Sequence, residues 1–251
     1  MSVPSLGKDL LGGTEFVGAF AILTGVTLAA GLAVLGIDIP KLSKAEFDDP
    51  GRPLGEIFRM PAVIVAVITA TFGYAVMTFL MTATPLAMTV GASLPFSDTA
   101  LVIEWHIVGM FAPGFFTGSL INRFGSPRII GAGNALLLTA VAIALTGSAV
   151  WQFWLSLVCL GVGWNFAFTG GTALLTEIDT PSERAKLQGT NDFIVFAFLA
   201  MASLTSGTIY HLLGWQWVNI LAVPLIVISL CSVLWLVATR RRARFVPKPA
   251  E

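Results

Sequence analysis

Long apolar stretches alternate with short polar segments along the whole chain. The hydrocarbon core of a bilayer is about 30 Å thick and needs about 20 apolar residues in helical form, because a helix satisfies its own backbone hydrogen bonds. Seven stretches are long enough, over residues 16–37, 61–83, 100–121, 128–149, 152–175, 190–212 and 216–238. The pattern therefore predicts an all-α integral membrane protein with seven transmembrane helices.

The composition agrees with this pattern. Hydrophobic residues make up 56% of the chain and charged residues 11%, whereas charged residues make up about 25% of a typical soluble domain. A soluble globular domain is therefore excluded. The arginines at positions 240, 241, 242 and 244 follow the last apolar stretch, which is typical of an anchor on anionic lipid. We expect the lipid bilayer as a partner and no nucleic acid.

Basic residues are sorted along the chain in a way that predicts its orientation. Thirteen of the fourteen Lys and Arg residues follow the first, third, fifth and seventh apolar stretches, and Lys8 is the exception. Short loops rich in Lys and Arg stay on the cytoplasmic side of a membrane. We therefore expect a multi-pass protein of the cell membrane with its amino terminus outside and its carboxyl terminus in the cytoplasm.

The longest polar segment predicts how the chain is divided. Residues 40–60 carry both signs of charge together with three prolines, and we expect them to form a cytoplasmic linker. Residues 61–239 would then form a six-helix bundle, and residues 240–251 a basic cytoplasmic tail. Residues 1–39 remain as an outer loop and one helix that belongs to a different bundle.

Two cytoplasmic turns of the predicted bundle are rich in glycine and charge. The first contains Gly118, Leu120, Asn122, Arg123, Gly125 and Arg128. Its glycines permit a sharp turn, and its arginines can pair with an acid or with the carbonyl end of a helix. The second contains Glu177, Pro181, Arg184 and Gly189. We expect Asn191 and Asp192 to open the helix that follows the second turn.

These turns resemble the Major Facilitator Superfamily of transporters. The first turn matches the family signature of Gly, Leu, Asp, Arg, Gly and a final basic residue, except that Asn122 stands at the Asp position. The charged interaction of that Asp would here be a neutral hydrogen bond. The second turn is similar to the loop between the family's tenth and eleventh helices, through Pro181, Arg184 and Gly189. Glu177 and Arg184 would join the first turn in a conformational switch.

The resemblance implies that half of a transporter is represented. The family has two six-helix halves, and this chain corresponds to the sixth to twelfth helices. We therefore expect that the amino-terminal half is missing, as in a truncated gene product. The complete protein would move a small organic solute by alternating access, coupled to protons, as a symporter or antiporter. The alternative is a membrane remnant that does not transport and acts through interactions.

Candidate substrate residues lie near the predicted midplane, where such transporters bind their solutes. They are Tyr74, Met77, Trp164, Asn165 and Phe168. Ordinary packing between helices is the alternative role for each. The glycines at positions 161, 163, 170 and 171 predict that the helix over 152–175 approaches its neighbours closely.

Glu104 and His106 are the candidates for proton coupling, since ionisable groups inside a membrane span are costly. Counted from Ala100, Glu104 lies only about 6 Å deep, and the two side chains point about 200° apart on a helix. The alternative to proton coupling is that Glu104 and His106 form an interfacial pair that contacts water in the outer vestibule.

Other functions fit the sequence less well. A retinal protein needs a lysine in its last helix, and residues 216–238 contain none. A seven-helix receptor would leave both glycine and arginine turns unexplained. The sequence lacks the grouped acids, histidines or nucleophile with its base that an enzyme site needs. We expect no catalytic residue, metal or cofactor.

Overall fold

The computed structural model describes residues 17–37, 51–177 and 180–244. Over these residues the chain is helical, and it divides into two compact units, Met1–Asp48 and Asp49–Glu251. The first unit contains α2 (Val17–Leu35). Its 19 residues correspond to about 28 Å of helix, close to the thickness of a bilayer core. Thr24 and Thr27 donate their hydroxyl hydrogens to carbonyls one turn earlier in α2, at 2.8 Å.

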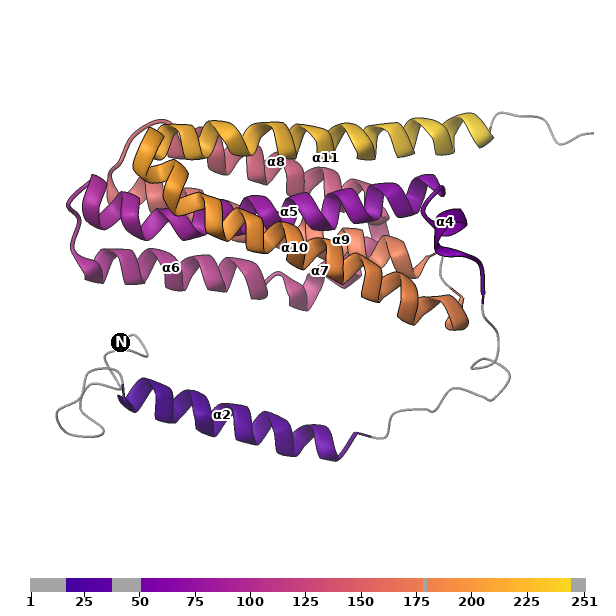
Figure 1. Ribbon diagram of the computed structural model, residues 1–251, viewed down its shortest axis with the longest axis horizontal. Helices are drawn as coiled ribbons and strands as arrows, with labels where there is room; N and C mark the ends of the chain where they lie inside the picture. Colours follow the sequence, from indigo (N-terminus) through magenta and orange to yellow (C-terminus); the bar gives the residue numbers. More distant parts are fainter. Residues whose placement is uncertain (1–16, 38–50, 178–179, 245–251) are drawn as a thin grey trace, which may run out of the picture. The chain divides into compact units, whose positions relative to one another are not determined.

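The second unit consists of long helices that run side by side (Figure 1). Its elements are α4 (Leu54–Ile57), α5 (Pro61–Leu86), the π-helix η1 (Ala87–Gly91), α6 (Phe96–Phe111), α7 (Gly114–Phe124), α8 (Ser126–Ala144), α9 (Val150–Thr176), α10 (Pro181–Leu213) and α11 (Trp215–Arg244). Within the described residues, six helical segments of this unit are long and apolar enough to cross a membrane. The all-α membrane fold is therefore confirmed, with α2 as a shorter apolar helix.

The helices of the second unit form two rows. We call the four helices with the order α6, α9, α5, α10 the front row, since these neighbours pack against one another. The second row consists of α8, which packs on α9, and α11, which packs on α5 and α8. Buried apolar side chains between the rows form the core, among them Leu80, Leu137, Leu157 and Ile226.

Glycines on three sides of α9 allow the close packing in this core. A side-chain carbon at Gly161 would lie 2.6 Å from the His106 carbonyl of α6. One at Gly163 would lie 3.0 Å from the Gly133 carbonyl of α8, and one at Gly171 would lie 3.1 Å from the Ala66 carbonyl of α5. The predicted close approach of this helix is confirmed, because the backbones meet where no side chain is present.

The start of α10 differs from the prediction. The helix begins at Pro181 rather than at residue 190, so Asn191 and Asp192 lie in its third turn and do not open it. Proline fits the first turn of a helix because its missing N–H would be unpaired there. The Glu183 carboxylate lies 3.5 Å from the Thr180 N–H, as in a capping box. These charged residues were expected in a loop but form the first turns of the helix.

The helix predicted over residues 100–121 is also different. It starts at Phe96 and is interrupted after Phe111, and a second segment, α7, starts at Gly114. Pro113 lies in the interruption, where it lacks the N–H that a continuous helix would use. The Phe115 N–H consequently donates to Ala112, three residues back, at 3.3 Å.

Candidate functional site

Three aromatic rings pack together in the middle of the front row. The rings of Trp164 and Phe168, one turn apart on α9, are stacked with their centroids 5.4 Å apart and an angle of 8° between their planes. The Tyr74 ring of α5 stands at nearly a right angle to both, at centroid distances of 5.2 Å and 5.3 Å. The structure thus brings together three of the predicted substrate residues.

Two further rings extend this group to the outer helices of the row. Phe111, the last residue of α6, lies 6.2 Å from Trp164, and Phe196 of α10 lies 6.4 Å from Tyr74. We call Tyr74, Phe111, Trp164, Phe168 and Phe196 the aromatic cluster. Its centre is covered, with Trp164 6% exposed, whereas Phe111 and Phe196 are 62% and 57% exposed. The cluster is therefore open at both flanks.

Phe111 and Phe196 were not predicted, although counting residues from the start of each helix could have found them. Tyr74, Phe111, Trp164 and Phe196 each lie 13 to 15 residues after the first residue of their helices. At 1.5 Å per residue this places each ring about 20 Å from a helix start. Some of these helices start at one end of the bundle and some at the other. Residues that lie equally far from their helix starts therefore meet near the middle of the bundle.

The other two predicted substrate residues have different surroundings. Met77 is 3% exposed and belongs to the same buried apolar group as Trp164. The Asn165 amide donates to the Met110 carbonyl at 2.8 Å and accepts from the Thr117 hydroxyl at 2.7 Å. Asn165 therefore binds both sides of the interruption between α6 and α7. A role of Met77 or Asn165 in substrate binding stays a prediction.

The Trp164 indole also carries an unused donor. Its N–H is buried and has no acceptor among the described residues. A buried indole N–H usually finds a hydrogen-bond partner. The centre of the aromatic cluster thus contains a donor that the described part of the chain does not satisfy.

Glu104 and His106 lie deeper than expected. Because α6 starts at Phe96, Glu104 is eight residues into the helix, which corresponds to about 12 Å rather than 6 Å. His106 is fully buried, with Nδ1 2.8 Å from the Leu157 carbonyl of α9, and Nε2 has no partner among the described residues. Glu104 is half-buried. The two side chains therefore lie in different surroundings, and their part in proton coupling stays a prediction.

Hydrogen bonds to Glu177 connect three helix ends on the predicted cytoplasmic side. The Glu177 carboxylate, directly after α9, accepts from the Ser126 hydroxyl of α8 at 2.8 Å and from the Arg240 guanidinium of α11 at 3.2 Å. Gly125 separates α7 from α8 with a φ of +84°, which favours glycine. Glu177 thus links α8, α9 and α11, and its part in a conformational switch stays a prediction.

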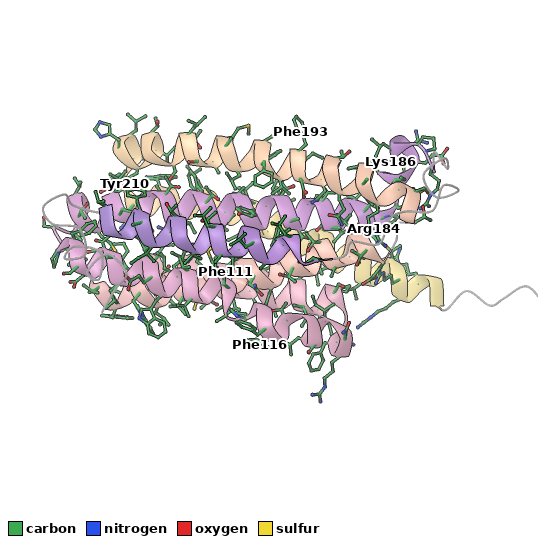
Figure 2. The ribbon with its side chains drawn as sticks, turned by 90° about the horizontal axis from the view of Figure 1, so that it is seen from below. Phe111, Phe116, Arg184, Lys186, Phe193 and Tyr210 are labelled. Carbon is green, nitrogen blue, oxygen red and sulfur yellow. The ribbon has the colours of Figure 1, made fainter. Side chains whose placement is uncertain are left out.

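The remaining residues of the two predicted turns lie near the surface. Asn122 is exposed, and Arg123 lies over the Phe124 ring at 5.2 Å. The Arg128 guanidinium donates to the Phe124 carbonyl at 3.2 Å. Gly118 has no atom within 4 Å of the position of a side chain. Arg184 and Lys186 lie near one end of α10 and Tyr210 near the other (Figure 2).

A second group of charges at this end was not predicted. The Arg52 guanidinium donates to both carboxylate oxygens of Glu183, at 2.7 Å and 2.8 Å, and the Arg52 backbone N–H donates to the same carboxylate at 2.8 Å. The Lys186 ammonium donates to the Arg52 carbonyl. These hydrogen bonds to Glu183 raise the pKa of Arg52. We call Arg52, Glu183 and Lys186 the inner clamp. It fixes the predicted linker to the start of α10.

The turn at Gly51 gives the first testable prediction. Gly51 has a φ of +58°, and a side-chain carbon there would lie 2.6 Å from Cγ of Glu183. Gly51→Ala should lower the thermal unfolding midpoint of the purified chain by about 5 °C, because the left-handed backbone and the displaced carboxylate together cost roughly 1–3 kcal/mol.

Gly55→Ala is the matched control for this prediction. Gly55 lies in the same segment, within α4, and has no atom within 4 Å of the position of a side chain. Its substitution should leave the midpoint unchanged or raise it slightly, since alanine favours a helix over glycine. Equal midpoints for the two variants would contradict the inner clamp.

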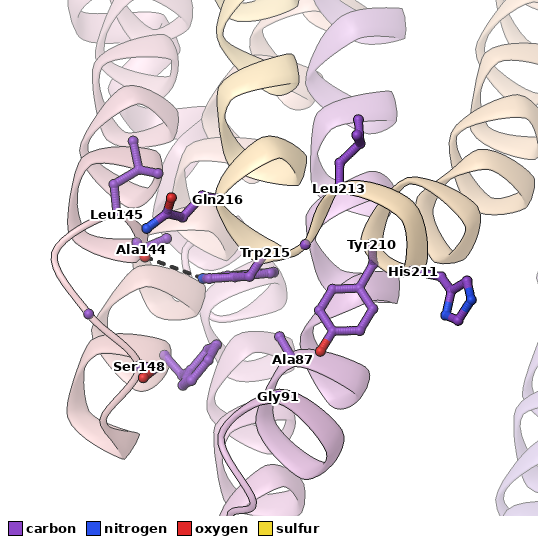
Figure 3. A pocket seen from close by; sticks show the side chains of 13 residues that line it. Ala87, Gly91, Ala144, Leu145, Ser148, Tyr210, His211, Leu213, Trp215 and Gln216 are labelled. Carbon is purple, nitrogen blue, oxygen red and sulfur yellow. Dashed lines mark hydrogen bonds between the residues drawn. The ribbon is translucent and has the colours of Figure 1, made fainter.

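One cavity of about 580 Å³ lies at the opposite end of the bundle, between the α8–α9 loop, η1 and the α10–α11 turn. Tyr210, Trp215 and Phe153 provide its aromatic walls, and the Trp215 indole donates to the Ala144 carbonyl at 3.2 Å (Figure 3). No member of the aromatic cluster lines this cavity. It is therefore separate from the candidate substrate residues.

Comparison with known proteins decides the family. A sequence model of the Major Facilitator Superfamily matches residues 99–251. The chain belongs to this superfamily. The resemblance noted in the two predicted turns is thereby confirmed, and the family consists of transporters rather than enzymes.

Two curated relatives are longer than the chain. The riboflavin transporter RfnT of Brucella anthropi is 42% identical over 229 residues, which cover 90% of this chain and 57% of RfnT. The uncharacterized MFS-type transporter YddS of Bacillus subtilis is 31% identical over 242 residues, 90% of this chain and 55% of YddS. The chain thus spans about half the length of the curated relatives that it matches.

Proposed function

We propose that this chain is the carboxy-terminal part of a secondary transporter for a planar heteroaromatic solute of the riboflavin type. The observation that carries the proposal is the aromatic cluster, to which all four front-row helices contribute. The name of the RfnT relative gives the same chemical class. Family transporters bind their solute near the midplane between two halves, and the position of the rings about 20 Å from their helix starts supports such a site.

The geometry of the cluster suits a flat ring system. Trp164 and Phe168 are parallel, and Tyr74 is perpendicular to them. Because Trp164 is only 6% exposed, the rings would have to part for a planar solute, which would then stack on one ring and meet the edge of another. Stacking of a base on an aromatic side chain contributes about 1–3 kcal/mol. The Trp164 N–H adds a donor for a carbonyl oxygen or ring nitrogen of the solute.

The remaining parts of the proposal concern the whole transporter. The chain would supply the carboxy-terminal six helices and one preceding helix, and an amino-terminal half would complete the substrate cavity. The distribution of basic residues supports an outside amino terminus and a cytoplasmic carboxyl terminus. Transport would proceed by rocking of the halves. Glu104, half-buried about 12 Å along α6, would carry the coupling proton.

Uptake of riboflavin tests this proposal. Bacterial cells that cannot make riboflavin should take up little of it when they produce residues 1–251 alone. A chimera that places the amino-terminal helices of RfnT before α2 should restore uptake, because it supplies the second half. A protonophore should lower uptake by the chimera, and Glu104→Gln should reduce it about tenfold or more without the protonophore.

Two results would overturn parts of this proposal. Uptake by residues 1–251 alone, at the level of the chimera, would refute the missing half. A membrane-inserted chimera that binds no riboflavin and restores no uptake would favour the alternative of a non-transporting membrane remnant. Asp98→Asn is the control for Glu104→Gln, since Asp98 lies in the first turn of the same helix.

A further inference from the structure

The interruption of the α6–α7 span lies at the level of the aromatic cluster. α6 ends at Phe111, which belongs to the cluster, and α7 starts three residues later. Pro113 between them has no N–H to offer, and the Phe115 N–H turns to Ala112. The carbonyls at the end of α6 therefore need donors from elsewhere. One of them, that of Met110, receives its hydrogen bond from Asn165 of α9 at 2.8 Å.

The same Asn165 side chain also holds the beginning of α7. Its Oδ1 accepts from the Thr117 hydroxyl at 2.7 Å, and Thr117 Oγ1 also lies 2.7 Å from the Pro113 carbonyl. Thr117 is fully buried and Asn165 is 6% exposed. Thr117 is the single buried residue of α7, all of which the structure describes. One amide thus bridges the two segments, and α7 has little other buried contact.

Asn165 follows Trp164, so the joint and the aromatic cluster share two consecutive residues of α9. Trp164 contacts the Phe111 ring on the α6 side of the interruption, while Asn165 reaches Thr117 on the α7 side. At its other end α7 leads through Gly125 to Ser126, which donates to Glu177. Of the turn predicted over residues 118–128, the structure leaves only Gly125 outside a helix, and α7 therefore connects the level of the cluster to the turn at Gly125.

We propose that Asn165 is a positioning residue that joins α7 to the aromatic cluster, so that a rearrangement of the cluster around a bound solute moves α7 and the turn at Gly125. The joint itself follows from the geometry, whereas its response to a solute rests on the proposed function. A hydrogen-bonded side chain at a proline interruption is suited to this task. It satisfies the freed backbone groups in one position of α7 and can release them in another.

Hydrogen–deuterium exchange of the purified full chain tests the joint without any solute. Thr117→Val removes the hydroxyl and keeps the shape, and Asn165→Leu removes both hydrogen bonds. Both variants should raise exchange over residues 114–124 about three- to tenfold, as expected for the loss of one or two buried hydrogen bonds. Ser156→Ala is the matched control, because Ser156 is also buried on α9 but donates to the Ala140 carbonyl of α8.

Riboflavin as a probe tests the coupling. Saturating riboflavin should slow exchange over residues 114–124 in the unaltered chain. In Thr117→Val, riboflavin fluorescence should still be quenched, but exchange over these residues should no longer respond. A merely structural role of Thr117 would leave the response to riboflavin intact.

Separate outcomes decide the two parts. Unchanged ligand-free exchange over residues 114–124 in both variants, or an equal rise in Ser156→Ala, would overturn the joint. If the unaltered chain quenches riboflavin fluorescence but its hydrogen–deuterium exchange over residues 114–124 does not slow, the coupling is overturned. If riboflavin binds neither the purified chain nor the chimera that carries the amino-terminal helices of RfnT, the proposed substrate and the coupling are refuted, and the ligand-free comparison still decides the joint.

Discussion

Trp164→Leu should weaken riboflavin binding to the purified chain roughly 5- to 100-fold, which corresponds to the loss of about 1–3 kcal/mol of stacking. Trp164 contacts three of the other four rings of the aromatic cluster, those of Tyr74, Phe111 and Phe168. Its removal therefore takes away both a stacking surface and the ring that fixes its neighbours. The dissociation constant is measured by isothermal titration calorimetry, because an indole stacked on riboflavin itself quenches the fluorescence of the flavin and its loss would change that signal.

Trp154→Leu is the matched control. Trp154 lies on the same helix, ten residues earlier, and forms a comparable pair with Trp105 at 5.8 Å, away from the aromatic cluster. It should bind riboflavin as the unaltered chain does. Phe196→Leu should lie between the two, because Phe196 is an exposed flank of the cluster. Equal binding by the Trp154 and Trp164 variants would remove the cluster from the substrate site.

The positions of the membrane helices could be predicted from the sequence because lipid restricts the choices. A span must be helical and apolar over about 20 residues, so hydropathy locates its middle. It does not locate its ends. The first turns of α10 carry Glu183, Arg184 and Lys186 and look like a loop by hydropathy. The 33 residues of α10 correspond to about 50 Å, longer than a bilayer core, so its charged end can extend beyond the membrane.

The candidate site could be predicted only in part for a related reason. Depth along a helix is a one-dimensional property, and Tyr74, Trp164 and Phe168 were found by it. Which sides of two helices face each other depends on their packing, and for that reason Phe111 and Phe196 were missed. The sequence also placed Asn165 among the substrate contacts. Its hydrogen bonds to Met110 and Thr117 join residues about 50 positions apart, and local pattern does not encode such pairs.

The inner clamp shows the same limit more strongly. Arg52 and Glu183 are separated by 131 positions. Each has an ordinary local explanation, as a linker charge and as a helix-capping acid. Their pairing changes the predicted linker from residue 51 onward into a part of the bundle, with Ile57 only 1% exposed.

Gly161→Ala should lower the thermal unfolding midpoint of the chain by about 5–10 °C, through an overpacking cost of roughly 1–3 kcal/mol. The added carbon would lie 2.6 Å from the His106 carbonyl and 2.9 Å from the Met110 backbone nitrogen. Both are backbone atoms of α6, which cannot turn away as a flexible side chain could. Circular dichroism of the purified chain during heating measures the midpoint.

Gly131→Ala is the control for this substitution. Gly131 lies within α8 and has no atom within 4 Å of the position of a side chain. The thermal unfolding midpoint of Gly131→Ala should therefore stay the same or rise slightly, because alanine has the better helix propensity. Equal losses in both variants would mean that α6 and α9 do not approach as closely as the structure shows.

The effect of Gly161→Ala should also reach the candidate site, because the Asn165 amide donates a hydrogen bond to the carbonyl of Met110. If α6 moves away from α9, this variant should weaken riboflavin binding although Gly161 belongs to no part of the aromatic cluster.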